Sequence, residues 1–122
     1  MTDDPLADRS STDRVLGEDL LAAPLDHVPL PDDEVDEGAP TTGLHPLGAV
    51  GDAEVGIWEM TEGTARDTEA DEIFIVLSGS GEVRFEDGSV VALRPGSAVR
   101  LRAGERTTWT IREALRKVYV AR

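Results

Sequence analysis

The stretch that decides the fold runs from Gly56 to Gly104 and reads GIWEMTEGTARDTEADEIFIVLSGSGEVRFEDGSVVALRPGSAVRLRAG. Short apolar or alternating runs are separated by glycine-bearing turns at close, regular intervals, a pattern typical of antiparallel barrels and sandwiches. The pair Asp87–Gly88 is the strongest turn signal, because this dipeptide favours tight hairpins. The stretch therefore predicts an all-β domain built from short antiparallel strands.

Around this stretch, the chain divides into an acidic N-terminal segment and a strand-rich part. Residues 1–40 are acidic and proline-rich, so we expect them to be largely disordered and regular structure to begin near Thr41. Residues 41–122 are predicted to hold roughly seven or eight short strands. Within them, residues 59–71 are interpreted as a loop and residues 112–116 as helix-like or irregular. The run IFIVL at 73–77 predicts a strand buried on both faces.

Length, composition and charge exclude several classes of protein. A chain of 122 residues accommodates one domain, and the lack of cysteine excludes disulfides and thiol catalysis. The formal net charge of −13 argues against nucleic acid as a partner. The sequence holds neither an apolar run of membrane-spanning length nor a secretory signal, so we expect no membrane partner and a cytoplasmic location.

Several short motifs occur in the order in which they are found in a known family. They include GIWE at 56–59, DEIF at 71–74, Gly79, Pro95–Gly96 and RKVY at 116–119. On these motifs, residues 41–122 resemble the Cupin_3 family, also called DUF861 or ureidoglycine-aminohydrolase-like cupins. The resemblance implies a double-stranded β-helix, or jelly roll, that pairs as a homodimer.

The resemblance also directs attention to a metal site. Metal-binding cupins place two histidines before an acidic ligand, here Glu72, and a third histidine in a second motif. The corresponding positions of this chain hold Ala65 and Asp67 (or, with a shorter spacing, Arg66 and Thr68) and Thr107. The two histidines of the chain, His27 and His45, lie upstream of both motifs. We therefore expect no metal and no cofactor, since one or two carboxylates do not supply the protein ligands of a catalytic metal.

The candidate ligand-binding residues are those that the resemblance and period-two alternation bring to the barrel interior. If Glu72 faces inward, Phe74 and Val76 share its face. The candidate set is Trp58, Arg66, Glu72, Arg102, Thr107, Trp109, Lys117 and Tyr119. For the two tryptophans, core packing is the slightly favoured interpretation.

Glu72 admits two interpretations. A carboxylate inside a barrel is costly unless it is paired, and Arg66, Arg102 or Lys117 can neutralise it. Alternatively, Glu72 faces a wet ligand pocket, where it can act as a catalytic acid or base. The two tryptophans favour a walled cavity, so we expect the second arrangement.

Three functional hypotheses follow. The leading one is a metal-free cupin that binds a small polar or anionic metabolite. The basic residues between 94 and 122 are interpreted as a solvated outer face, and capture of an anion by their guanidinium groups is the alternative. The second is a hydrolase- or isomerase-type enzyme that uses Glu72 as its acid or base. The third is a non-catalytic protein-interaction module. An open polar pocket favours the first two, whereas a barrel plugged by side chains favours the third.

Overall fold

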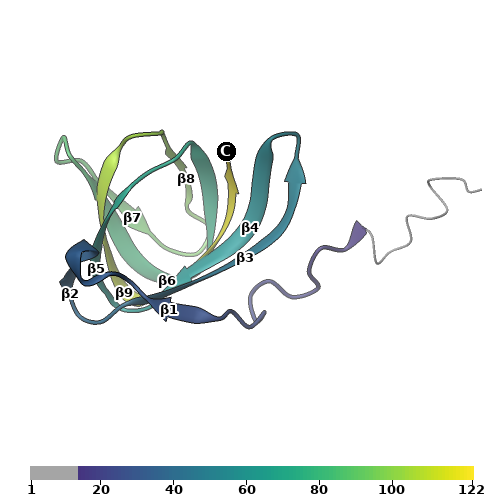
Figure 1. Cartoon of the computed structure of the whole chain (residues 1–122), viewed down its shortest axis with the longest axis horizontal. Coiled ribbons are helices and arrows are strands. Elements are labelled where there is room, and N and C mark those ends of the chain that lie inside the picture. The colour runs from purple at the N-terminus through teal and green to yellow at the C-terminus, as the bar shows by residue number, and fades with distance from the viewer. Residues whose placement is uncertain (1–13) are drawn as a thin grey trace, which may run out of the picture.

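The structure, a computed structural model of the chain, describes residues 14–122 and shows an all-β architecture, as predicted. The elements are β1 (His27–Pro29), the 3-10 helix η1 (Asp32–Glu34), β2 (Val35–Glu37), β3 (Thr41–Val50), β4 (Ala53–Met60), β5 (Gly63–Thr68), β6 (Glu72–Phe85), β7 (Val90–Leu93), β8 (Ala98–Leu101) and β9 (Arg106–Ala121). The strands form one sheet that curls around a common interior (Figure 1). No helix in residues 14–122 is long and apolar enough to cross a membrane.

Strand β9 holds the curled sheet together. It pairs antiparallel with β6 over most of its length, with β5 over Arg106–Ile111 and with β4 over Leu115–Ala121. β3 pairs with β4, while β7 and β8 pair with β6. Because β9 pairs with three other strands, side chains from all of them converge on the interior.

Two segments expected to be irregular are strands. The predicted loop 59–71 contains β5, whose Ala65 is buried opposite Trp109 of β9. The predicted irregular residues 112–116 lie within β9, opposite the part of β6 where the register shifts between Val76 and Gly81. Ala65 is the one buried apolar residue of β5, and Leu115 is the one within residues 112–116, so neither segment shows the alternation that predicts a strand.

The core lies on the inner face of the curled sheet. Phe74 and Val76 of β6 are buried on one face, which confirms the predicted alternation. Ile73 and Ile75, on the opposite face, are 46% and 45% exposed. The prediction that this strand is buried on both faces is therefore wrong, because nothing in residues 14–122 covers its outer face.

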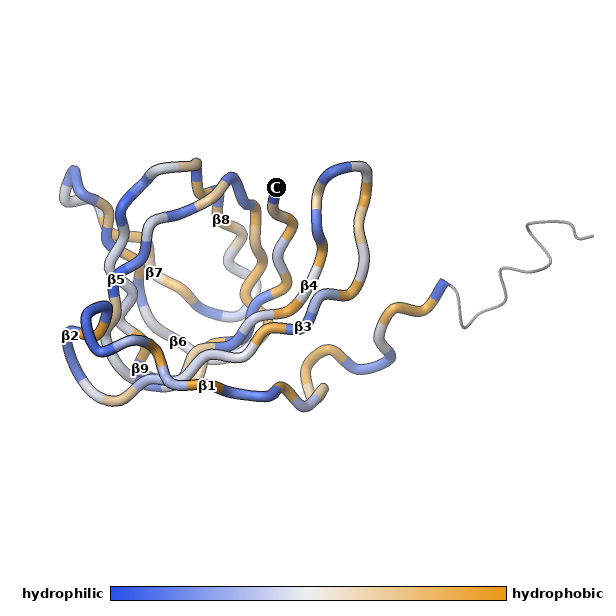
Figure 2. The backbone as a smooth tube through the Cα atoms, viewed as in Figure 1, coloured by the Kyte–Doolittle hydropathy of each residue, from blue (hydrophilic) through white to orange (hydrophobic). Residues whose placement is uncertain are grey.

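The N-terminal segment is also more ordered than predicted. β1 pairs with β3, and β2 pairs with β5, so regular structure begins before Thr41. The acidic residues of η1 form a hydrophilic stretch at the surface beside β2 (Figure 2). The predicted disorder of the first residues falls on 1–13, which lie outside the described residues.

Arg116 fastens this segment to the barrel wall. Its buried guanidinium donates hydrogen bonds from Nη1 to the carbonyl oxygens of Leu20, at 2.9 Å, and Ala23, at 2.7 Å. Its Nε donates to Oε2 of Glu59 at 2.9 Å, and the other oxygen of Glu59 lies 2.8 Å from Nε2 of His27. One side chain thus joins β9, β4 and the segment that precedes β1.

Replacing Arg116 by methionine is expected to lower the free energy of unfolding by about 3 kcal/mol, because a half-buried carboxylate and two carbonyl groups lose their donor. Urea unfolding measures the loss, and limited proteolysis near Leu20 should become faster. Arg112→Met is the matched control, since within residues 14–122 the exposed Arg112 guanidinium binds Glu82 alone, at 2.6 Å, and its loss should cost less than about 1 kcal/mol. Equal stability of the two variants would contradict the fastening role.

Candidate functional site

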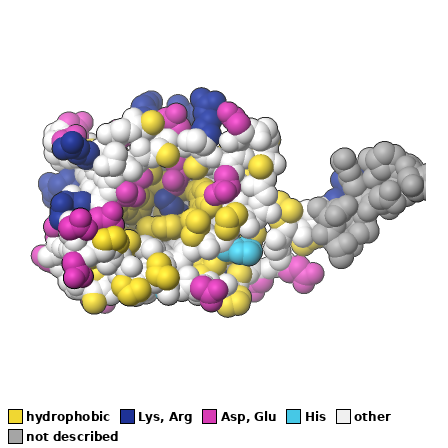
Figure 3. All heavy atoms as spheres, in the orientation of Figure 1, with side chains coloured by type: hydrophobic (Ala, Val, Ile, Leu, Met, Phe, Trp, Pro, Cys, Tyr) yellow, Lys and Arg dark blue, Asp and Glu magenta, His cyan; other side chains and the backbone are white. Residues whose placement is uncertain are grey.

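The interior of the barrel contains a pocket of about 240 Å³. Figure 3 shows it as a hollow in the face of the molecule, where a basic side chain lies among hydrophobic and acidic ones. Its walls come mainly from β3, β4, β5, β6 and β9 and from the loop that joins β5 to β6. Five of the lining side chains are carboxylates: Glu34, Glu54, Asp67, Glu69 and Glu72.

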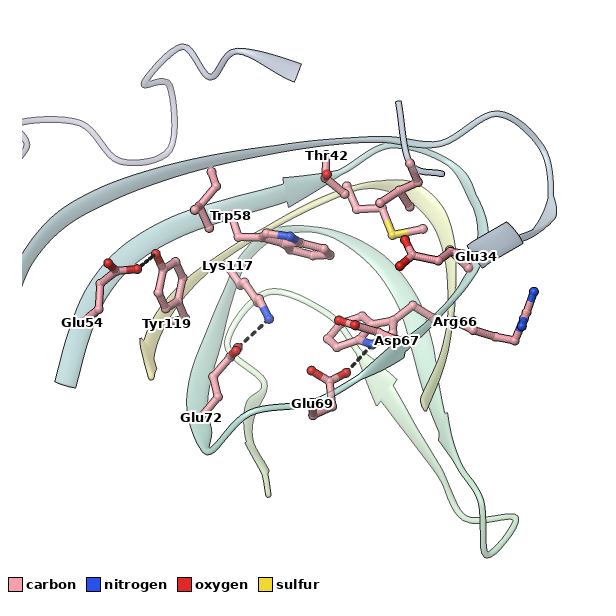
Figure 4. Close-up of a pocket in the computed structure, with 15 residues that line it drawn as sticks. Glu34, Thr42, Glu54, Trp58, Arg66, Asp67, Glu69, Glu72, Lys117 and Tyr119 are labelled. Atoms are coloured by element: carbon pink, nitrogen blue, oxygen red, sulfur yellow. Dashed lines mark hydrogen bonds and ion pairs between the residues drawn. The ribbon is translucent and has the colours of Figure 1, made fainter. Parts of the chain in front are cut away.

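Lys117 occupies the centre of the site. Its side chain is 6% exposed, and Nζ donates a hydrogen bond of 2.5 Å to Oε2 of Glu72 (Figure 4). The same Nζ lies 4.3 to 4.9 Å from three ring centroids, those of Trp58, Phe74 and Trp109. The aromatic faces and the carboxylate together stabilise the ammonium in a position that water scarcely reaches.

Glu69 lies in the same pocket as Lys117, and two side chains of β9 fix the position of its carboxylate. Its Oε2 accepts hydrogen bonds from the Thr107 hydroxyl at 2.6 Å and from Nε1 of Trp109 at 2.9 Å. The loop that carries Glu69 is fixed by backbone bonds, with Glu69 N–H donating to Glu105 and Gly104 N–H donating to Glu69. Contacts from β9 and from the turn before it therefore determine the orientation of the Glu69 carboxylate.

Burial raises the pKa of both Asp67 and Glu69. The Asp67 charge raises the pKa of Glu69 further, while the two hydrogen bonds and the Lys117 charge oppose the rise. Three carboxylates, those of Asp67, Glu69 and Glu72, thus share one ammonium. This side of the pocket carries excess negative charge whenever all three are ionised.

Tyr119 and Glu54 line another part of the pocket. The Tyr119 hydroxyl donates a hydrogen bond to Oε2 of Glu54 at 2.7 Å. Burial is the main cause that raises the pKa of Tyr119 well above its usual range, and the neighbouring Glu54 carboxylate raises it further. Gly56 leaves the room for the ring, since a Cβ there would lie 2.4 Å from the Tyr119 oxygen. The missing side chain of Gly56 is thus what allows Tyr119 to reach Glu54.

The structure brings together most of the predicted site residues. Trp58, Glu72, Trp109, Lys117 and Tyr119 line the pocket.

Three predicted residues take other positions. Arg66 reaches the rim but extends outward, where it binds Asp36 through Nε at 2.9 Å (Figure 4). Thr107 lies behind the pocket as a support for Glu69. Arg102 is exposed just after β8 and lies outside this pocket, in a neighbouring hollow that Glu72 also lines. It follows β8, which pairs with the start of β6 at the margin of the barrel.

The expected arrangement of Glu72 also needs correction. We expected a carboxylate in a wet pocket rather than in a buried ion pair, but Glu72 both lines the pocket and pairs with Lys117. Of the three cations considered as partners, only Lys117 binds it among the described residues. The alternation that places Glu72 inward from β6 places Lys117 inward from β9 as well, directly opposite Val76.

Sequence reasoning missed Glu69 and Glu54. Glu69 belongs to residues 59–71, which were interpreted as a loop, and its position depends on contacts with residues 104–109. Glu54 is two residues from Gly56, and the reason for that glycine becomes visible only once Tyr119 is placed across the sheet. No local pattern indicates either residue.

The residues at the histidine positions of metal-binding relatives do gather at this site, because Ala65 pairs with Trp109 and Asp67 pairs with Thr107. They supply one carboxylate and one hydroxyl, with a lysine ammonium nearby. No group of three or more His, Cys, Asp or Glu within residues 14–122 is placed to hold a metal ion. His27 binds Thr41 and Glu59 through its ring nitrogens, and His45 lies exposed on β3. The donor set does not fit a transition metal.

A curled antiparallel sheet around a polar interior pocket defines a cupin-type jelly roll. The family model described as "EutQ-like cupin domain" (Cupin_3) matches residues 47–119, and the chain belongs to this family. None of the curated proteins matches the chain.

Solved structures agree with the family. The chain is similar to a putative ethanolamine utilization protein Q from Salmonella typhimurium, with 26% identity, 66% of this chain and 68% of the other covered, and a TM-score of 0.57. It shares its fold with EutQ of Clostridium difficile (23% identity, 73% and 75% covered, TM-score 0.60). It also shares its fold with a DUF861 protein of unknown function from Pseudomonas syringae (20% identity, 83% and 45% covered, TM-score 0.72).

Proposed function

We propose that this cupin binds a small polar metabolite that presents an amino or hydroxyl group to Asp67 and Glu69. The observation that carries the proposal is the excess of carboxylates over cations in the pocket. Lys117 is already matched by Glu72, so the remaining charge on Asp67 and Glu69 favours a donor or a cation. An anionic ligand, which was part of the leading hypothesis, fits this lining poorly.

The shape of the pocket supports the same class of ligand. Its volume of about 240 Å³ is below the usual range of roughly 300–1,000 Å³ for drug-sized ligands. Trp58 and Trp109 offer an apolar wall, with ring centroids 5.5 Å apart. A compound of a few heavy atoms, with one short apolar segment, suits these dimensions.

The pocket also helps to choose between ligand binding, catalysis and a pure protein-interaction role. A hollow lined by convergent polar groups supports a ligand-binding or catalytic role over a pure interaction module. The similar Salmonella protein is named for ethanolamine utilization, so ethanolamine, a small amino alcohol, is one of the compounds to test. The homodimer implied by the family resemblance stays a prediction.

The test is a thermal-shift screen followed by calorimetry, with small amines, amino alcohols and diols compared with acetate and phosphate. We expect amines or amino alcohols to stabilise the protein and Glu69→Gln to weaken their binding about tenfold or more, because a charge-assisted hydrogen bond is lost. Amine binding should also weaken as the pH falls through the raised pKa of Glu69, since protonation removes its charge.

Glu82→Gln serves as the control for this screen. Glu82 lies on β6 and binds the exposed Arg112, outside the pocket lining, so the affinity of this variant should equal that of the parent. Binding of the anions alone, or equal weakening by both variants, would contradict the proposal.

A further inference from the structure

Lys117 is the single lysine of the chain, since the other 11 of its 12 Lys and Arg residues are arginines. Every cation at the surface of the described structure is therefore a guanidinium, while the one ε-amine is buried in the pocket. The two groups differ chemically. A guanidinium stays protonated, whereas an amine can lose its proton and attack a carbonyl carbon.

The surroundings of Lys117 leave part of its bonding capacity open. An ammonium has three N–H donors, and among the described residues one hydrogen bond is made, to Glu72. The three aromatic rings contact the ammonium without accepting a conventional hydrogen bond. Since Lys117 also lines the cavity, a bound molecule can bring an oxygen atom to Nζ.

We propose that Lys117 captures a small aldehyde or ketone in this pocket as a reversible imine. The proposal rests on the proposed function, because it uses the same pocket and adds the identity of the group that reacts. A hydroxyl on the carbonyl compound would face Asp67 and Glu69, as the proposed ligand does. The substrate class is thus a short hydroxycarbonyl compound.

The carboxylates around Lys117 can carry out the necessary proton transfers. Glu72, 2.5 Å from Nζ, accepts a proton from the ammonium and leaves a neutral amine. The nitrogen lone pair attacks the carbonyl carbon, so that the C–N bond forms as the C=O π bond breaks. The proton that nitrogen then gives up passes to the oxygen through a neighbouring carboxylate, producing a carbinolamine.

In the second half of the reaction, the proton held by Glu72 passes to the carbinolamine hydroxyl, which leaves as water. The nitrogen lone pair forms the C=N bond. The sum is ammonium plus carbonyl compound giving protonated imine plus water, with no change in oxidation state and no other reactant.

The site is suited to the product as well as to the free lysine. A protonated imine carries the same single positive charge as the ammonium that it replaces. The Glu72 carboxylate and the faces of Trp58 and Trp109 therefore stabilise both states in the same way. Formation of the imine therefore leaves no buried charge without a partner.

Reductive trapping tests the proposal. The full chain is incubated with glycolaldehyde and sodium cyanoborohydride, and the adduct is located by peptide mass spectrometry. We expect Lys117 to be modified at least about tenfold faster than Nα-acetyl-lysine amide, because the pocket orients the carbonyl carbon. Excess ethylene glycol, which matches glycolaldehyde in size and lacks the carbonyl group, should slow the modification.

Two comparisons keep the result interpretable. Nα-acetyl-lysine amide in the same reaction mixture reports the reactivity of an unassisted amine, so the ratio of Lys117 adduct to model-amine adduct does not depend on any variant folding. Lys117→Arg keeps the positive charge and should give no adduct in the barrel. Modification of Lys117 no faster than the model amine would overturn the proposal.

The outcome also separates this inference from the proposed function. If small amines or diols stabilise the protein while Lys117 resists trapping, imine capture is overturned and the binding pocket stands. If none of these compounds binds and Lys117 is unreactive, both proposals fail.

Discussion

Lys117→Met should lower the free energy of unfolding by about 3–5 kcal/mol, because it leaves Glu72 buried without its partner. Methionine matches the length of the aliphatic stem and keeps contact with the three rings, so little of the loss comes from a cavity. Asp67 and Glu69 lose the same neighbouring positive charge. The loss should shrink at acid pH, because burial raises the pKa of Asp67 and Glu69, and protonation of these two carboxyl groups removes the charge that Lys117 would balance. Urea unfolding at several pH values measures it.

The double variant Glu72→Gln/Lys117→Met is the control for this prediction. It removes both charges of the buried pair and should recover at least half of the lost stability, because replacing a whole buried pair costs far less than removing one partner. A double variant as unstable as Lys117→Met would show that the ion pair is not the source of the effect.

Gly79→Ala should cost about 4 kcal/mol or more, or prevent folding. Gly79 lies in the irregular part of β6 with φ of +89°, and a Cβ there would lie only 2.0 Å from the carbonyl oxygen of Ala114. Because the obstructing atom is backbone in β9, the two strands must separate to admit a methyl group. The yield of soluble protein and the thermal midpoint measure the effect.

Gly88→Ala measures how much stability is lost through the positive φ alone, without a steric clash. Gly88 has the same φ of +89°, but nothing lies within 4 Å of the position that its Cβ would take. This variant should cost only the conformational penalty, about 1–2 kcal/mol. Equal costs for the two variants would contradict the close approach of β6 and β9 at Gly79.

The fold was largely predictable from the sequence, because its turns and alternation are local signals. The hairpin at Asp87–Gly88 and the shared face of Phe74 and Val76 follow from residue type and spacing alone. β5 and the middle of β9 were not predicted as strands, because their own residues give no strand signal. β5 is extended through its pairing with β9, and the middle of β9 through its pairing with β6.

The site was predictable in part. Alternation and family resemblance placed Glu72 and Lys117 in the interior, where they pair. They did not reveal Glu69, whose orientation is set by Thr107 and Trp109 nearly 40 residues away along the chain. Arg102 lies outside the pocket, because the strand that precedes it ends at the barrel margin. Residue type indicated the chemistry available, whereas long-range contacts decided which groups meet.

The position of β9 in the sheet has a consequence for how the molecule is made. β4, β5 and β6 have their shared partner only in residues 106–121, so none of them can complete its pairing until that strand has been synthesised. Contacts between such distant parts of a chain slow the search for the native state. During synthesis, the unpaired edges and apolar inner faces of the earlier strands stay open to other chains, which makes chaperone binding to the nascent protein an advantage.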